Sequence, residues 1–65
     1  MTKAYIVFVE SKLDGNRVSS EAYKTLREAQ RFIENRSDRP QKQTEYTYRG
    51  GGYNFYTIYD INIID

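Results

Sequence analysis

Hydrophobic residues gather in separate parts of the chain, and the spacing within each part predicts an element. Residues 4–9 (Ala-Tyr-Ile-Val-Phe-Val) are β-branched and aromatic, too short a run for a helix, and predict a strand that is apolar on both faces. Residues 44–49 alternate polar and aromatic side chains, and residues 53–64 carry apolar side chains at nearly every odd position. These two segments predict a second and a third strand.

A helix is expected before the second strand. Residues 25–28 (Thr-Leu-Arg-Glu) have the form of a capping box, in which the Thr25 hydroxyl accepts from the Glu28 amide and the Glu28 carboxylate returns to the Thr25 amide. The helix should run from about Leu26 to Arg36, or begin earlier, near Ser20. Its inner side is expected to carry Leu26, Ala29, Phe32 and Ile33.

Between the first strand and this helix, residues 12–17 contain Asp14-Gly15-Asn16, residue types that tolerate positive φ. A hairpin is possible in principle at such a turn. Val18 is the only strong strand former that follows, so we expect a loop.

The order strand, helix, strand, strand predicts one α+β domain over residues 1–65, a βαββ unit. A right-handed crossover leads from the first strand to the second, and a hairpin adds the third. We place the last strand in the centre because it is the longest and most apolar. The result is a three-stranded antiparallel sheet of order 1-3-2 with one helix packed on one face; the alternative order is 3-2-1.

The glycine run at residues 50–52 is expected to form the turn between the last two strands. Facing residues of a hairpin lie on one side of the sheet, so the pattern constrains the loop length. A three-residue loop mixes the faces, whereas an even loop pairs Tyr48 with Tyr53 and Tyr46 with Phe55. We therefore expect an even loop, with Gly-Gly suited to a type I′ turn because both central residues need positive φ.

One helix covers one face of this sheet, and an apolar face left uncovered is the usual mark of a protein interface. The pattern leaves open whether the uncovered row contains Val7 or Ile6 and Phe8. The interface hypothesis takes the first of these rows with matching residues of the last strand: Tyr5, Val7, Val9, Tyr56 and Ile58. A chain of 65 residues buries only a small core, so covering that face in a homodimer would add stability.

Composition narrows the chemistry. The chain lacks cysteine and histidine, which excludes disulfides, thiolate chemistry and the usual zinc sites. Its 9 acidic residues are spread without metal or acid–base spacing, so we expect no enzyme, no catalytic residue, no metal and no cofactor. No apolar run is long enough to cross a membrane and no signal peptide is recognised, so we expect a cytoplasmic protein with no membrane partner.

Nucleic acid is the alternative partner. The net charge of +1, from 10 basic and 9 acidic residues, gives no global attraction to it. Basic residues and tyrosines nevertheless lie near the glycine run, and binding of single strands needs cations beside stacking aromatics. The candidate residues are Arg36, Arg39, Lys42, Tyr48 and Arg49.

Three segments together carry a resemblance: AYIVFVES (4–11), EAYKTLREAQRFIENR (21–36) and YTIYDINI (56–63). This pattern resembles small proteins encoded by bacteriophages and prophages of Gram-positive bacteria, which often run strand, Thr/Ser-Leu-x-Glu-Ala helix and terminal Tyr-x-Ile strand. The resemblance implies a role as a small adaptor, regulator or inhibitor of a host protein, and it carries over no functional residue. The expected function is a non-enzymatic protein-binding module, acting as a homodimer or on another protein, with weak binding of single-stranded nucleic acid as the alternative.

Overall fold

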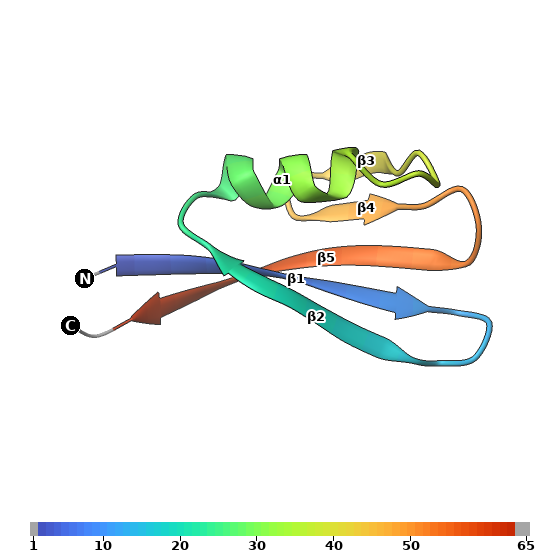
Figure 1. Cartoon of the computed structure of the whole chain (residues 1–65), viewed down its shortest axis with the longest axis horizontal. Coiled ribbons are helices and arrows are strands. Elements are labelled where there is room, and N and C mark those ends of the chain that lie inside the picture. The colour runs from blue at the N-terminus through green and yellow to red at the C-terminus, as the bar shows by residue number, and fades with distance from the viewer. Residues whose placement is uncertain (1, 64–65) are drawn as a thin grey trace.

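The computed structural model describes residues 2–63 and shows an antiparallel sheet of five strands with a helix on one side (Figure 1). Along the sheet the strand order is β2-β1-β5-β4-β3. The elements in chain order are β1 (Thr2–Ser11), β2 (Arg17–Tyr23), α1 (Leu26–Glu34), β3 (Gln41–Thr44), β4 (Thr47–Arg49) and β5 (Asn54–Ile63). The last strand was expected to reach residue 64, which lies outside the described residues.

The predicted three-stranded sheet of order 1-3-2 is wrong, because two strands were not recognised in the sequence. Both of them, β2 and β3, are edge strands with mostly polar, exposed residues. Polar edge strands are held by pairing with a neighbour and need no apolar row of their own. The segment that contains α1 therefore connects the two edges of the sheet, from β2 to β3, and is not a crossover between the first strand and its successor.

The expected loop at residues 12–17 is instead the turn of the β1–β2 hairpin. Gly15 has a φ of 76°, and the Asn16 amide donates to the Asp14 carboxylate at 3.0 Å. This hydrogen bond lowers the pKa of Asp14. The turn sets Glu10 opposite Arg17, and Tyr23 at the other end of β2 packs against the core, while Val18 is largely exposed.

The capping prediction is confirmed at Thr25, whose hydroxyl accepts from the Glu28 amide at 3.1 Å. The return bond differs from the prediction: the Glu28 carboxylate accepts from the Thr25 hydroxyl, at 3.2 Å, in place of the Thr25 amide. The helix is shorter than expected and ends at Glu34, and the residues from Ser20 belong to β2 and not to an earlier helical turn. Its predicted inner side is confirmed: Ala29 and Ile33 are buried, and Leu26 and Phe32 pack against them in part.

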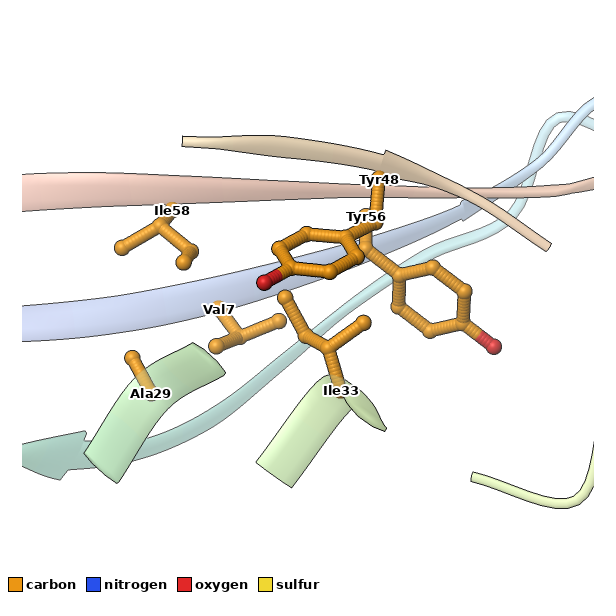
Figure 2. Close-up of a cluster of buried hydrophobic side chains, with 6 residues drawn as sticks. All are labelled: Val7, Ala29, Ile33, Tyr48, Tyr56 and Ile58. Carbon is orange, nitrogen blue, oxygen red and sulfur yellow. The ribbon is translucent and has the colours of Figure 1, made fainter. Parts of the chain in front are cut away.

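The core lies between α1 and the sheet and contains residues from four elements (Figure 2). Its buried members are Val7, Ala29, Ile33, Tyr48, Tyr56 and Ile58, with Tyr5, Val9 and Tyr23 partly buried beside them. The helix thus covers the row of β1 that contains Val7. The five residues proposed as an interface, Tyr5, Val7, Val9, Tyr56 and Ile58, all lie on the side covered by α1 and so do not form an exposed interface.

The predicted even loop is wrong as well. Tyr48 pairs with Tyr56 and Arg49 with Phe55, which leaves an odd number of residues in the turn. This register lets both tyrosine rings face α1, where they are 2% and 0% exposed. No positive φ occurs at residues 50–52, so the turn is not of type I′.

Two of the three glycines, Gly50 and Gly51, allow the turn to approach the loop that follows α1 closely. The Gly51 amide donates to the Asp38 carbonyl oxygen at 2.9 Å, and a Cβ on Gly51 would lie 2.6 Å from that oxygen. A Cβ on Gly50 would meet the Asp38 carboxylate and lie 3.2 Å from the Tyr56 ring. Gly52 has nothing within 4 Å of the corresponding position.

Asp38 joins this loop to the core. Its carboxylate accepts from the Tyr56 hydroxyl at 2.6 Å and from the side-chain amide of Asn54 at 3.4 Å. Burial favours the neutral acid, but these hydrogen bonds to the charged form outweigh it and lower the pKa of Asp38. Arg39, the next residue, has a positive φ of 50°, so hydrogen bonding through Asp38 holds a strained backbone in place.

We predict that Gly51→Ala destabilises the fold by about 1–3 kcal/mol, because the new methyl group displaces the Asp38 backbone. The matched control Gly52→Ala, in open space, should change the free energy of unfolding by no more than about 0.5 kcal/mol. Urea denaturation of both variants gives the comparison. Equal losses at the two positions would contradict the contact.

Asp38 should also make stability dependent on pH. Since its folded pKa is lowered, its contribution is present above the unfolded pKa of about 4 and is lost as the pH falls through the lower folded value. We expect Asp38→Asn to lose about 1–3 kcal/mol at pH 7 and to vary less with pH below about 4.

Thermal unfolding between neutral and acidic pH measures the difference. Tyr56→Phe removes the main donor to Asp38 and keeps the carboxylate, so part of the acid dependence should disappear there too. An Asp38→Asn variant with the full acid dependence of the parent would refute this assignment.

Candidate interaction surface

The side of the sheet opposite α1, called here the open face, carries the apolar row that the sequence shows at the odd positions of β5. Neighbouring residues in a strand point to opposite sides, so these residues point away from the helix that covers Tyr56 and Ile58. Within residues 2–63, α1 contacts β1, β2 and β5 from the other side. Tyr59, Ile61 and Ile63 are 44%, 43% and 43% exposed.

The register between β1 and β5 makes this row into an apolar stripe. Ile6 lies opposite Tyr59 and Ala4 opposite Ile61. Phe8 meets the Tyr59 ring edge-to-face, with ring centroids 5.0 Å apart and an interplanar angle of 87°. A sheet with one solvated face normally alternates apolar and polar residues, so an apolar row on the outer side is unusual for a face in contact with water.

Cations lie over the aromatic rings at one end of the stripe. The Arg17 guanidinium is 4.5 Å from the Phe8 ring centroid and 5.7 Å from that of Tyr59. Arg17 also donates to the Tyr59 hydroxyl at 3.1 Å. We call this end the cation–aromatic cluster, and it contains Phe8, Lys12, Arg17, Arg49, Phe55 and Tyr59.

The other ring of the cluster is covered in the same way. Lys12 Nζ lies 5.1 Å and the Arg49 guanidinium 5.4 Å from the Phe55 ring centroid. Lys12 is also within 2.7 Å of the Glu10 carboxylate, and its hydrogen bond and charge lower the pKa of Glu10. Three cations therefore share this end with one carboxylate.

The residues predicted to bind nucleic acid are not brought together. Tyr48 is buried, and its hydroxyl donates to Glu34 at 2.8 Å. Burial, with the hydrogen bond to Glu34 second, raises the pKa of Tyr48 to about 12. No base can stack on a ring that lies under the helix.

The four basic residues of that set are also dispersed. Arg36 lies 5.8 Å from the Phe32 ring on the helix side, and Lys42 pairs with the inward-facing Tyr48. Arg39 is exposed in the loop after α1. Arg49 alone reaches the open face, where it joins the cation–aromatic cluster.

Arg17 and Lys12 were missed because their hairpin was interpreted as a loop. Only the pairing of Glu10 with Arg17 brings Arg17 beside Phe8. The signal that identifies this arrangement is Asp14-Gly15-Asn16, the turn on which the pairing depends.

A hollow of about 290 Å³ lies on the other side, between α1 and β2. Its lining residues are Val9, Val18, Ser19, Ser20, Phe32 and Arg36. The Ser20 hydroxyl already accepts from the Val7 amide at 3.0 Å and donates to the Glu21 carbonyl at 2.8 Å, so it is engaged in the β1–β2 hairpin. In the part of the chain that the structure describes, no group of acidic residues has the arrangement of a metal site, and no helix has the length and apolar character of a membrane span.

Comparison of the chain with protein-family models, curated proteins and solved structures found no match. The resemblance to small phage-encoded proteins stays a prediction, as does the expectation of a non-enzymatic role. The open face, with an apolar end and a cation–aromatic end, is the surface on which a functional proposal rests.

Proposed function

We propose that this chain is a non-enzymatic protein-binding module that binds through the open face of its sheet. The observation that carries the proposal is the uncovered row of Tyr59, Ile61 and Ile63, each more than 40% exposed in a chain of 65 residues. Fully burying an isoleucine side chain contributes about 1.5–3 kcal/mol. A partner that covers the exposed part of each side chain in this row would gain a fraction of that free energy per residue. A partner gains this free energy without disturbing the core.

The composition of the open face also suits a protein partner. Aromatic residues and arginine are enriched at interfaces, where they act as anchors beside apolar contacts. Both residue types meet at Tyr59, whose ring lies edge-to-face with Phe8 and whose hydroxyl accepts from Arg17. The partner is a second copy of the chain or another protein, in keeping with the adaptor, regulator or inhibitor roles that the resemblance implies and with the expected cytoplasmic setting.

A photo-reactive phenylalanine analogue at position 59 tests this surface. We expect covalent capture of a partner from that position, in purified protein or in cells, because the ring lies in the middle of the open face. The matched control is position 31, on the exposed side of α1. A product of twice the chain mass identifies a homodimer, and a different mass identifies another protein.

Equal capture at the two positions, or none at position 59, would contradict the proposal. Circular dichroism of both labelled proteins shows that the fold is kept, so that absence of capture is informative.

Binding of single-stranded nucleic acid is a second candidate function, favoured by the cation–aromatic cluster. Bases stack on aromatic side chains while cations contact the phosphates, and every base offers a π-face. Tyr59 is 44% exposed, and Arg17 lies next to it on the same face. This candidate replaces the dispersed set that contained Tyr48.

Fluorescence anisotropy with a labelled oligothymidine tests the second candidate. We expect binding that weakens as salt rises, and a salt slope reduced by about 1 in Arg17→Ala, which loses one phosphate contact. Arg27→Ala is the control, because Arg27 lies on α1 and pairs with Glu34 at 3.7 Å. Absence of binding at low salt, or equal losses in the two variants, would rule the candidate out.

A further inference from the structure

The C-terminal half of β5 has a free edge. β4 pairs only with residues 55–57 of β5, and the Ile58 amide donates to the Tyr46 carbonyl oxygen at 2.7 Å where that pairing ends. From Tyr59 to Ile63, β5 is paired with β1 on one side, and no other strand within residues 2–63 lies on the opposite side. Figure 1 shows this part of β5 extending past β4 and α1 toward the C-terminal end.

The direction of the backbone groups at this edge follows from the hydrogen bonds to β4. The Ile58 amide and the Asn54 carbonyl both point away from β1, since they bond to Tyr46 and Gly50. Backbone groups alternate in direction along an antiparallel strand, so those of Asp60 and Asn62 point to the same side. The free edge thus offers two N–H and two C=O groups to a further strand.

From this geometry we infer that the free edge of β5 pairs antiparallel with the same edge of a second copy, with Ile61 opposite Ile61 of that copy. This inference goes beyond the proposed function, because edge pairing leaves the open faces of both copies uncovered and available to a partner. Asp60 of each copy then forms a hydrogen-bonded pair with Asn62 of the other. All five residues from Tyr59 to Ile63 are paired.

Charge favours this register over its neighbours. A centre at Asp60 would set two carboxylates directly opposite each other, which is destabilising in a sheet. A centre at Asn62 leaves only the three residues from Ile61 to Ile63 paired among those described. With the centre at Ile61, the carboxylate faces a neutral amide and keeps its contact with Lys3 in its own chain, at 3.5 Å.

This edge carries few of the features that normally prevent pairing. Edge strands are usually protected by charged side chains, especially lysine, by proline or by a bulge. Residues 59–63 contain one charged residue, Asp60, which is paired with Lys3 of its own chain; they contain neither proline nor lysine and pair with β1 without any shift of register. At the opposite edge of the sheet, β2 carries two charged residues and a register irregularity against β1.

Pairing of this kind places both open faces on the same side, because its two-fold axis runs perpendicular to the sheet. Tyr59 of one copy lies opposite Ile63 of the other, and the two apolar stripes join into one. The two helices lie together on the far side. A contact of five residues per strand is smaller than a standard interface, so the dimer should be weak, in the micromolar range.

Sedimentation velocity over a range of concentrations, with Asn62→Pro and Asn62→Ala, tests the pairing. Proline at 62 removes an outward N–H and no bond to β1, so the fold should be kept while the dissociation constant of the dimer rises at least about tenfold. Alanine at 62 keeps the N–H and should leave dimerisation nearly unchanged. Circular dichroism confirms folding of each variant.

A pair of charge variants tests the register. Asn62→Asp sets a carboxylate opposite Asp60 of the other copy and should weaken the dimer by roughly fivefold, whereas Asn62→Lys should strengthen it by roughly fivefold. Within one chain the effects on stability are the opposite, since position 62 pairs with Lys3: aspartate there should stabilise the monomer and lysine should destabilise it. Monomer stability and dimer affinity should therefore change in opposite directions, which a general effect on folding does not produce.

Three results would overturn the inference: a monomer at all concentrations up to about 1 mM, a dimer that Asn62→Pro leaves intact, or charge variants that shift affinity in the same direction. The cross-link at position 59 separates the proposed function from this pairing by mass and by variant: a product of twice the chain mass that Asn62→Pro abolishes comes from the edge pairing, and one that Asn62→Pro leaves unchanged comes from the open face. Capture of a different protein there, from a chain that stays monomeric, supports the open face and rejects the edge pairing.

Discussion

Tyr48 and Tyr56 lie under α1 in an apolar core, and each must find a hydrogen-bond acceptor there. Tyr48 donates to Glu34 and Tyr56 to Asp38. Placing both rings on the covered side fixes the pairing of β4 with β5, which leaves an odd number of residues for the turn. The same register places Asp38 against Gly50 and Gly51. It leaves the odd-numbered row of β5 on the open face.

The sequence predicts the parts of this structure that have a strong local pattern. The apolar first strand, the helix with its cap at Thr25 and the long last strand follow from spacing and capping chemistry. The two polar edge strands could not be predicted in this way, since they have no apolar row and depend on their neighbours for pairing. The even-loop prediction failed because it placed Tyr48 on the same face as the odd-numbered aromatic residues of β5, whereas Tyr48 pairs with Tyr56.

One apolar face must stay uncovered, because the first strand is apolar on both faces and one helix covers only one side of the sheet. The sequence pattern does not show which face this is. Both rows of β1 are apolar, and only the position of the helix decides between the row of Val7 and the row of Ile6 and Phe8. That position depends on a segment that runs from the β2 edge to the β3 edge, which a three-stranded topology does not contain. The cation–aromatic cluster could not be predicted for the same reason, because Arg17 reaches Phe8 only through the β1–β2 hairpin.

The central position of β5 has a consequence for how the chain acquires its fold. The β1–β2 and β3–β4 hairpins are each local, yet they share no strand until β5, which follows every other element in the sequence, enters between them. During synthesis the sheet therefore stays in two halves until this segment has left the ribosome. The β1–β5 contacts that join the halves are far apart in sequence, which is typical of slowly folding proteins. Until then both edges that β5 will occupy remain open to other chains.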